Sequence, residues 1–179
     1  MSVLGDRLQV VWLAVIVASV GAAAGFASSA RFAGTATMVA IYGGVTVVLA
    51  LVAAWRAWQE EALGDWLRPV GLDITRGCFA GGFLLFAAYL FSKYLLTPDS
   101  PRVGWIARVY LQLGEPSALR AHMTSISIVI CVIALAEEMV WRGLVVLLLS
   151  ELVGSRRAWI YAVVLYAIAH VPTAFALAD

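Results

Sequence analysis

The chain has 179 residues, of which 63% are hydrophobic and only 13% are charged, and its mean hydropathy is +0.94. Soluble domains are roughly half apolar and a quarter charged, so this composition excludes an ordinary soluble domain and predicts an integral membrane protein. The net charge of +1 gives no reason to expect a nucleic-acid partner. The two cysteines, Cys78 and Cys131, lie in apolar segments without metal-ligand spacing, so we expect free thiols.

Five apolar segments are long enough to cross a bilayer, which takes ~20 residues in a helix. They are residues 8–26, 35–54, 78–96, 124–150 and 158–177. A cleaved signal peptide is the alternative for the first segment, but the four spans that follow favour a retained helix. We therefore predict an all-α fold, a polytopic transmembrane helix bundle with about five spans in a single membrane domain, residues 1–179.

Two connections have the composition of helices that lie on the membrane surface. Residues 55–66 carry three tryptophans among charged side chains, and indoles favour the headgroup level. Residues 102–113 repeat apolar side chains at helical spacing with polar ones between them, although an ordinary loop is the alternative. The G-x-x-x-G patterns at residues 21–25 and 77–81 predict close helix packing.

The arginines are divided unequally between the two sides of the predicted bundle. The side of the N-terminus receives Arg7, Arg56, Arg68, Arg76, Arg156 and Arg157, and the other side receives Arg31, Arg102, Arg108 and Arg120, with Lys93 near a span end. The positive-inside rule then predicts a cytoplasmic N-terminus.

The fourth span contains three charged residues, Glu137, Glu138 and Arg142. A single charge at mid-bilayer costs about 2.5–3.5 kcal/mol on insertion scales, so these charges need partners or a function. Glu138 and Arg142 are spaced i, i+4 with the acid first, which favours an intrahelical ion pair. Glu137 points about 100° away and has no charged residue one turn before or after it. A carboxylate in that position is suited to take a proton from water.

The fifth span contains His170, with Tyr166 one turn earlier on the same helix face. Two consecutive antiparallel spans can bring Glu137 and His170 to a similar depth, and Tyr166 is the nearest further donor. His122, beside Arg120, is expected at the membrane edge. The residues alone leave three interpretations open: a structural polar cluster, a proton-coupled carrier that uses Glu137, and a hydrolytic site.

Two motifs resemble those of a known enzyme family. The run Glu137-Glu138-Met139-Val140-Trp141-Arg142 matches E-E-x-x-x-R, and Tyr166-Ala167-Ile168-Ala169-His170 resembles a second motif, an aromatic residue followed four positions later by histidine. Residues 118–179 thereby resemble the core of the CAAX prenyl protease and bacteriocin-processing family of intramembrane glutamic endopeptidases. Their motifs are similar to those of the myxosortases, bacterial relatives that process membrane-anchoring tails. The spans within residues 1–117 carry no signature.

The resemblance implies an endopeptidase that hydrolyses a peptide bond near the membrane face. Glu137 would activate water, and His170 would orient the water or stabilise the oxyanion. Glu138, Arg142 and Tyr166 would give structural polar support. The implied partners are membrane lipid and a membrane-anchored peptide or protein, and the implied location is the bacterial inner membrane.

The resemblance also has two gaps that bear on activity. Zinc hydrolases use about three protein ligands, and H-E-x-x-H is absent, so we expect no cofactor; if zinc were used, Glu137 and His170 would be its ligands. A third family motif, histidine followed four residues later by asparagine or a similar residue, is not present. We therefore expect the core at residues 118–179 to be incomplete at its C-terminus and the 179-residue chain to be inactive alone. A degenerate homologue that binds a partner or confers immunity is the leading alternative.

Overall fold

The structure is a computed structural model that describes residues 3–68, 70–96, 104, 107 and 114–178, and these residues form helices and loops without a strand. The long helices are α1 (Val3–Ala27), α2 (Ala36–Gln59), α4 (Asp73–Leu95) and α9 (Ser155–Ala178), and a fifth is continuous through α7 (Met123–Glu138), η1 (Met139–Val145) and α8 (Val146–Val153). Each of the five is long and apolar enough to span a membrane. The predicted all-α bundle with five spans is confirmed, and the protein is an integral membrane protein.

The connections differ in detail from the prediction. Thr35 lies outside α2 and caps it, because its side chain accepts a hydrogen bond from the Met38 N–H. The segment 55–66 is divided, since its first half continues α2 and only α3 (Leu63–Leu67) forms a separate helix. Nothing in residues 55–59 breaks a helix, and Arg56 pairs with Glu60 one turn later at 3.0 Å. The second predicted surface helix, residues 102–113, lies outside the described residues except at positions 104 and 107.

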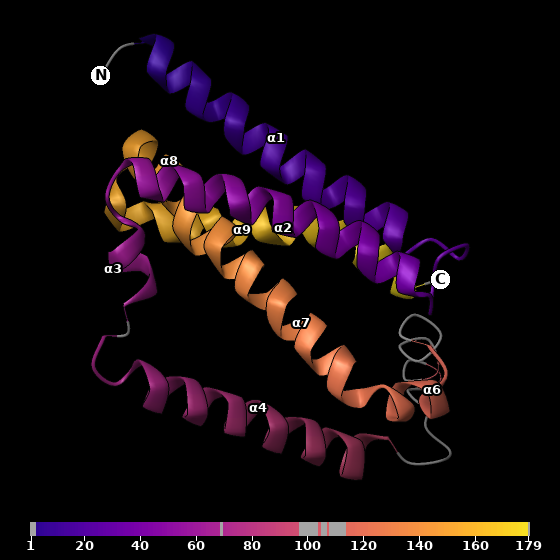
Figure 1. Cartoon of the computed structure of the whole chain (residues 1–179). Helices are drawn as coiled ribbons and strands as arrows, with labels where there is room; N and C mark the ends of the chain where they lie inside the picture. The colour runs from indigo at the N-terminus through magenta and orange to yellow at the C-terminus, as the bar shows by residue number, and fades with distance from the viewer. Residues whose placement is uncertain (1–2, 69, 97–103, 105–106, 108–113, 179) are drawn as a thin grey trace.

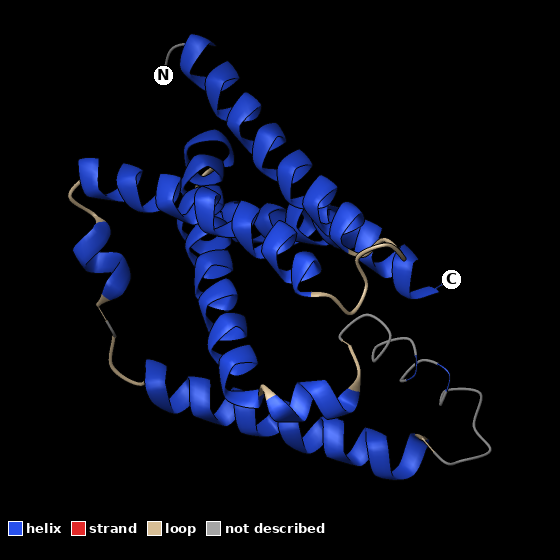
Figure 2. Cartoon of the chain, turned by 45° about the vertical axis from the view of Figure 1, so that its right-hand side comes forward, coloured by secondary structure: helices blue, strands red, loops and turns tan. Residues whose placement is uncertain are grey.

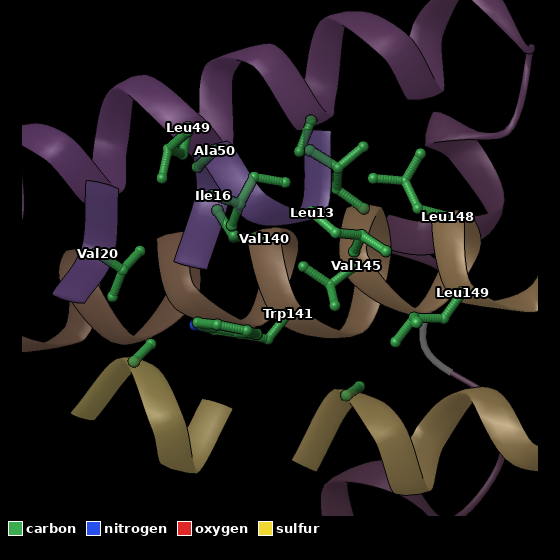
Figure 3. Packing of buried hydrophobic residues seen from close by; sticks show 14 of the residues in the cluster. Leu13, Ile16, Val20, Leu49, Ala50, Val140, Trp141, Val145, Leu148 and Leu149 are labelled. Carbon is green, nitrogen blue, oxygen red and sulfur yellow. The ribbon is translucent and has the colours of Figure 1, made fainter. Parts of the chain in front are cut away.

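The core lies among α1, α2, η1, α8 and α9, where apolar side chains are excluded from the surface (Figure 3). Its largest fully buried apolar side chains are Ile16, Val20, Val140, Val145 and Leu148. A short helix, α6 (Pro116–Ala121), precedes α7. By contrast, α4 has no buried residue and lies apart from α1, α2, α8 and α9 in both cartoon views (Figures 1 and 2). Its exposed aromatic and aliphatic side chains suit lipid contact.

The two G-x-x-x-G patterns behave differently. A Cβ added at Gly25 in α1 would lie 3.1 Å from the Pro172 Cβ, and one at Gly21 would lie 3.5 Å from the Ala169 carbonyl oxygen. The prediction of close packing is confirmed there, because the absent side chains let α1 approach α9. The prediction was wrong for Gly77 and Gly81 in the described part of the chain, because a Cβ added at either position would meet no atom of another helix within 4 Å. Cys78 and Cys131 are free, as expected, and exposed.

A polar cluster joins three helices at the end of α2 that is far from its N-cap. Besides Glu60, Arg56 faces Glu151 of α8, with an Arg56 Nη2 to Glu151 Oε1 distance of 3.9 Å. Gln9 of α1 donates a hydrogen bond to the same carboxylate. These contacts compensate charges at one end of the bundle, and the residues of the predicted site lie away from them.

Candidate active site

Three helices converge on one polar group in the interior of the bundle. Glu137 comes from the end of α7, His170 from α9 and Tyr42 from α2. The Tyr42 hydroxyl donates a hydrogen bond to Glu137 Oε1 and lies 2.9 Å from His170 Nε2. Glu137 Oε1 and His170 Nε2 are 3.9 Å apart. The two residues that the sequence singled out therefore meet, as the antiparallel arrangement of their spans predicts.

The adjacent glutamates have different surroundings. Glu138 forms the expected i, i+4 ion pair, with its Oε2 2.8 Å from Arg142 Nε, and these side chains are 55% and 82% exposed. The Glu137 and His170 side chains are only 23% and 25% exposed. The ion pair thus occupies an outer face of the helix, and Glu137 faces inward. Glu137 has no charged partner on its own helix, as predicted, but it has partners from two others.

His170 is held by α9 itself. Its Nδ1 lies 2.8 Å from the Tyr166 carbonyl oxygen, and the two rings stack with centroids 4.1 Å apart. The Trp141 ring meets Tyr166 edge-on, at a centroid distance of 5.2 Å. Tyr166 thus supports the histidine through its ring and its backbone carbonyl. Its hydroxyl makes no hydrogen bond to any residue in the described part of the chain, so the contacts of Tyr166 with His170 come from its carbonyl and its ring.

A π-helical segment, η1, begins directly after the two glutamates. The Val146 N–H donates to the Trp141 carbonyl, five residues earlier, in place of the usual four. Such widened turns occur often at functional sites. The segment buries Trp141 beneath the Tyr166 and His170 rings. Figure 3 shows Trp141 lying below the α1 and α2 side chains of the core.

An apolar cavity of about 1320 Å³ adjoins the polar group, and Tyr42, Glu137, Tyr166 and His170 all line it. Most of its wall comes from α2 and α7. It extends to Ser28 and Thr35, in the connection between α1 and α2, and to Glu115 before α6. His122, expected at the membrane edge, also lines it. The polar group is therefore accessible from a large apolar space that reaches one end of the bundle.

The described residues do not fit a zinc site. They contain no cluster of three or more His, Cys, Asp or Glu side chains that could hold a metal ion. Glu137 and His170 would supply two ligands where zinc hydrolases use three. The third group beside them is a tyrosine hydroxyl, so we derive no chemistry through a metal.

Tyr42 is the residue that sequence reasoning missed. It lies in Ile41-Tyr42-Gly43-Gly44, in a span without a motif and 95 residues from Glu137. One signal could have identified it, because a hydroxyl group inside a membrane span needs a hydrogen-bond partner. The neighbouring Gly43 also allows α2 to approach α7, since a Cβ there would lie 2.9 Å from Ile133 Cδ1.

Comparison with known protein families gives a match over the C-terminal third of the chain. A family model described as type II CAAX prenyl endopeptidase, Rce1-like, matches residues 120–178, the segment that carries Glu137 and His170. Neither a search of curated proteins nor one of solved structures finds a match. The resemblance that the two motifs indicated is confirmed. The C-terminal third of this membrane protein, residues 120–178, is thus similar to the Rce1-like type II CAAX prenyl endopeptidases.

Proposed function

We propose that the protein is an intramembrane endopeptidase that hydrolyses a peptide bond with water activated by Glu137. The observation that carries the proposal is the approach of Glu137 to His170, 3.9 Å apart at the wall of an apolar cavity. A structural ion pair gives no reason for this arrangement, because Arg142 already pairs with the neighbouring Glu138 on another face. The similarity of residues 120–178 to a family of endopeptidases supports the same chemistry.

The reaction needs a base and a donor on one side of the scissile bond. Glu137 removes a proton from water while the oxygen attacks the carbonyl carbon, and the carbonyl electron pair moves to its oxygen. His170, beside Glu137, orients the water or stabilises that oxyanion; removing one oxyanion donor typically costs 10²–10³-fold in rate. When the carbon–nitrogen bond breaks, the leaving nitrogen must take up one proton. The site can supply it, because Glu137 has gained one proton from water.

The cavity supports a membrane-anchored peptide or protein as the substrate, with lipid as the surrounding partner. Its wall is apolar, and it extends to Ser28 and Thr35. Because α1 separates this connection from the N-terminus, the cavity reaches the side of the membrane opposite to the N-terminus. With a cytoplasmic N-terminus in a bacterial inner membrane, the substrate would be cut on the extracytoplasmic side.

The test is the Glu137→Gln variant, which keeps the size of the side chain and removes the base. The natural gene product, reconstituted in lipid vesicles with a membrane-anchored reporter peptide, should cleave it, and Glu137→Gln should lower turnover by at least about 10²-fold. Glu61→Gln makes the same chemical change at an exposed position outside the site and should leave turnover unchanged. Cleavage by Glu137→Gln at the wild-type rate would refute the mechanism.

The leading alternative has a distinct outcome. A homologue that binds a partner without hydrolysis would insert and fold normally. Neither its wild type nor any of its variants would cleave the peptide. A proton-coupled carrier would acidify or alkalinise the vesicle lumen in a Glu137-dependent manner without cutting the peptide. Either result would replace the endopeptidase proposal.

A further inference from the structure

The hydrogen bonds among Glu137, Tyr42 and His170 limit where their protons can lie. The Tyr166 carbonyl can only accept a hydrogen bond, so the His170 Nδ1 that lies 2.8 Å from it must carry a proton. The Tyr42 hydroxyl has one proton, which it can direct at Glu137. In that case the 2.9 Å contact between the hydroxyl and His170 Nε2 is made by a proton on Nε2. One arrangement of the protons is therefore an ionised Glu137, a neutral Tyr42 and a charged His170.

A second arrangement uses the same atoms and the same number of protons. If the Nε2 proton moves to the Tyr42 oxygen while the Tyr42 proton moves to Glu137, both end groups become neutral. The hydroxyl lies between two groups that are themselves 3.9 Å apart, too far for a direct hydrogen bond. Tyr42 is the only described side chain that hydrogen-bonds to both of them.

We infer that the Tyr42 hydroxyl is a proton bridge that couples Glu137 to His170 during peptide hydrolysis. This inference rests on the proposed function. In each turnover Glu137 gains a proton from water, and His170 Nε2 gives one to the leaving nitrogen. Glu137 then passes its proton to the Tyr42 oxygen as Tyr42 passes its own to Nε2. The starting protonation is restored, and the products are one carboxylic acid and one amine.

The Tyr42→Phe variant tests the bridge, because it removes the oxygen and keeps the ring that meets His170 edge-on, with ring centroids 6.2 Å apart. Tyr42→Phe should lower kcat by about 10²-fold, the lower part of the range for a lost proton-transfer group, and change KM by less than about twofold. Tyr161→Phe on α9 makes the same substitution at an exposed position and serves as the control.

A spectroscopic measurement separates a bridge from a merely structural tyrosine. In the ¹⁵N NMR spectrum of histidine-labelled protein, with the His170 signals assigned by comparison with His122→Gln, Tyr42→Phe should shift the Nε2 signal. It should leave Nδ1, which faces the Tyr166 carbonyl, largely unchanged, and Tyr161→Phe should move neither.

Three outcomes are distinct. If wild type cleaves, Glu137→Gln does not, and Tyr42→Phe behaves like Tyr161→Phe, the bridge is overturned and the endopeptidase stands. If Tyr42→Phe loses activity but the Nε2 signal is unmoved, Tyr42 is structural and the bridge is again overturned. If wild type itself fails to cleave, the proposed function fails first, and a shifted Nε2 signal would then support only the hydrogen bond.

Discussion

Glu137 and Glu138 are neighbours in the chain, yet one turns inward to two other helices and the other pairs with Arg142 on an exposed face. The difference follows from the 100° rotation between consecutive helical residues. It allows one short motif to supply both an inward-facing carboxylate and an ion pair that compensates a charge inside the span.

At the level of single residues, we expect Arg142→Ala to lower the amount of folded protein. The substitution leaves Glu138 unpaired inside a membrane span, where a single charge costs about 2.5–3.5 kcal/mol on insertion scales. The double variant Glu138→Ala/Arg142→Ala removes both charges and should recover most of the loss. The yield of monodisperse protein after detergent extraction measures both effects. A double variant as poor as Arg142→Ala would show that the arginine has another role.

Among the elements, η1 is enclosed on one side by the core and on another by α3. A Cβ built at Gly143 in η1 would lie 2.5 Å from the nearest carbon of the Trp66 ring, and two more ring carbons would lie within 2.9 Å. Only glycine admits a rigid indole this closely, so the short helix α3 is fixed to the π-helical segment that follows the site. Nothing comparable is found at Gly81 in α4.

This contact predicts that Gly143→Ala is destabilising although alanine is the better helix former. The ring must move, and overpacking of this kind typically costs about 1–3 kcal/mol. Gly81→Ala meets no atom and should be neutral or stabilising by up to about 1 kcal/mol. Thermal unfolding of the two variants in the same detergent compares them. Equal midpoints would mean that Trp66 is not held against η1.

The sequence predicts the membrane spans and, of the candidate site, Glu137 and His170 but not Tyr42. Long apolar runs determine membrane helices locally, and the motifs with Glu137 and His170 lie on consecutive spans, so their meeting follows from chain direction. Tyr42 depends on how α2 packs against α7 and α9, and no periodicity near it encodes that contact. The π-helical turn could not be predicted either, because the sequence of Met139–Val145 has the pattern of an ordinary α-helix.

At the scale of the whole molecule, the five spans alternate in direction, and this determines which loops share a side of the membrane. The turn between α8 and α9 lies on the side of the N-terminus, and α6 lies on the opposite side. The excess of arginine on the first side, including Arg156 and Arg157, predicts that it is cytoplasmic.

We therefore expect single cysteines at Ser155 and Ser117 to react from opposite sides of the membrane. In a background without Cys78 and Cys131, an impermeant maleimide added to intact cells should label Ser117→Cys. Ser155→Cys should react only after the cells are opened. Labelling of both in intact cells would contradict the spanning of α7, η1 and α8, on which the depth of Glu137 depends.

The single-residue turn at Gly154 has a consequence for how the protein is made. Gly154 has a φ of +83°, which glycine adopts readily, and it alone separates α8 from α9. Glu137 precedes it by 17 residues (154 − 137) and His170 follows it by 16 (170 − 154), so each arm reaches about 25 Å at helical rise. A hairpin with arms of nearly equal length brings the acid and the imidazole to the same depth, so it can leave the translocon as one unit. Tyr42, synthesised earlier on α2, then meets them in lipid, and neither polar group has to cross the bilayer interior alone.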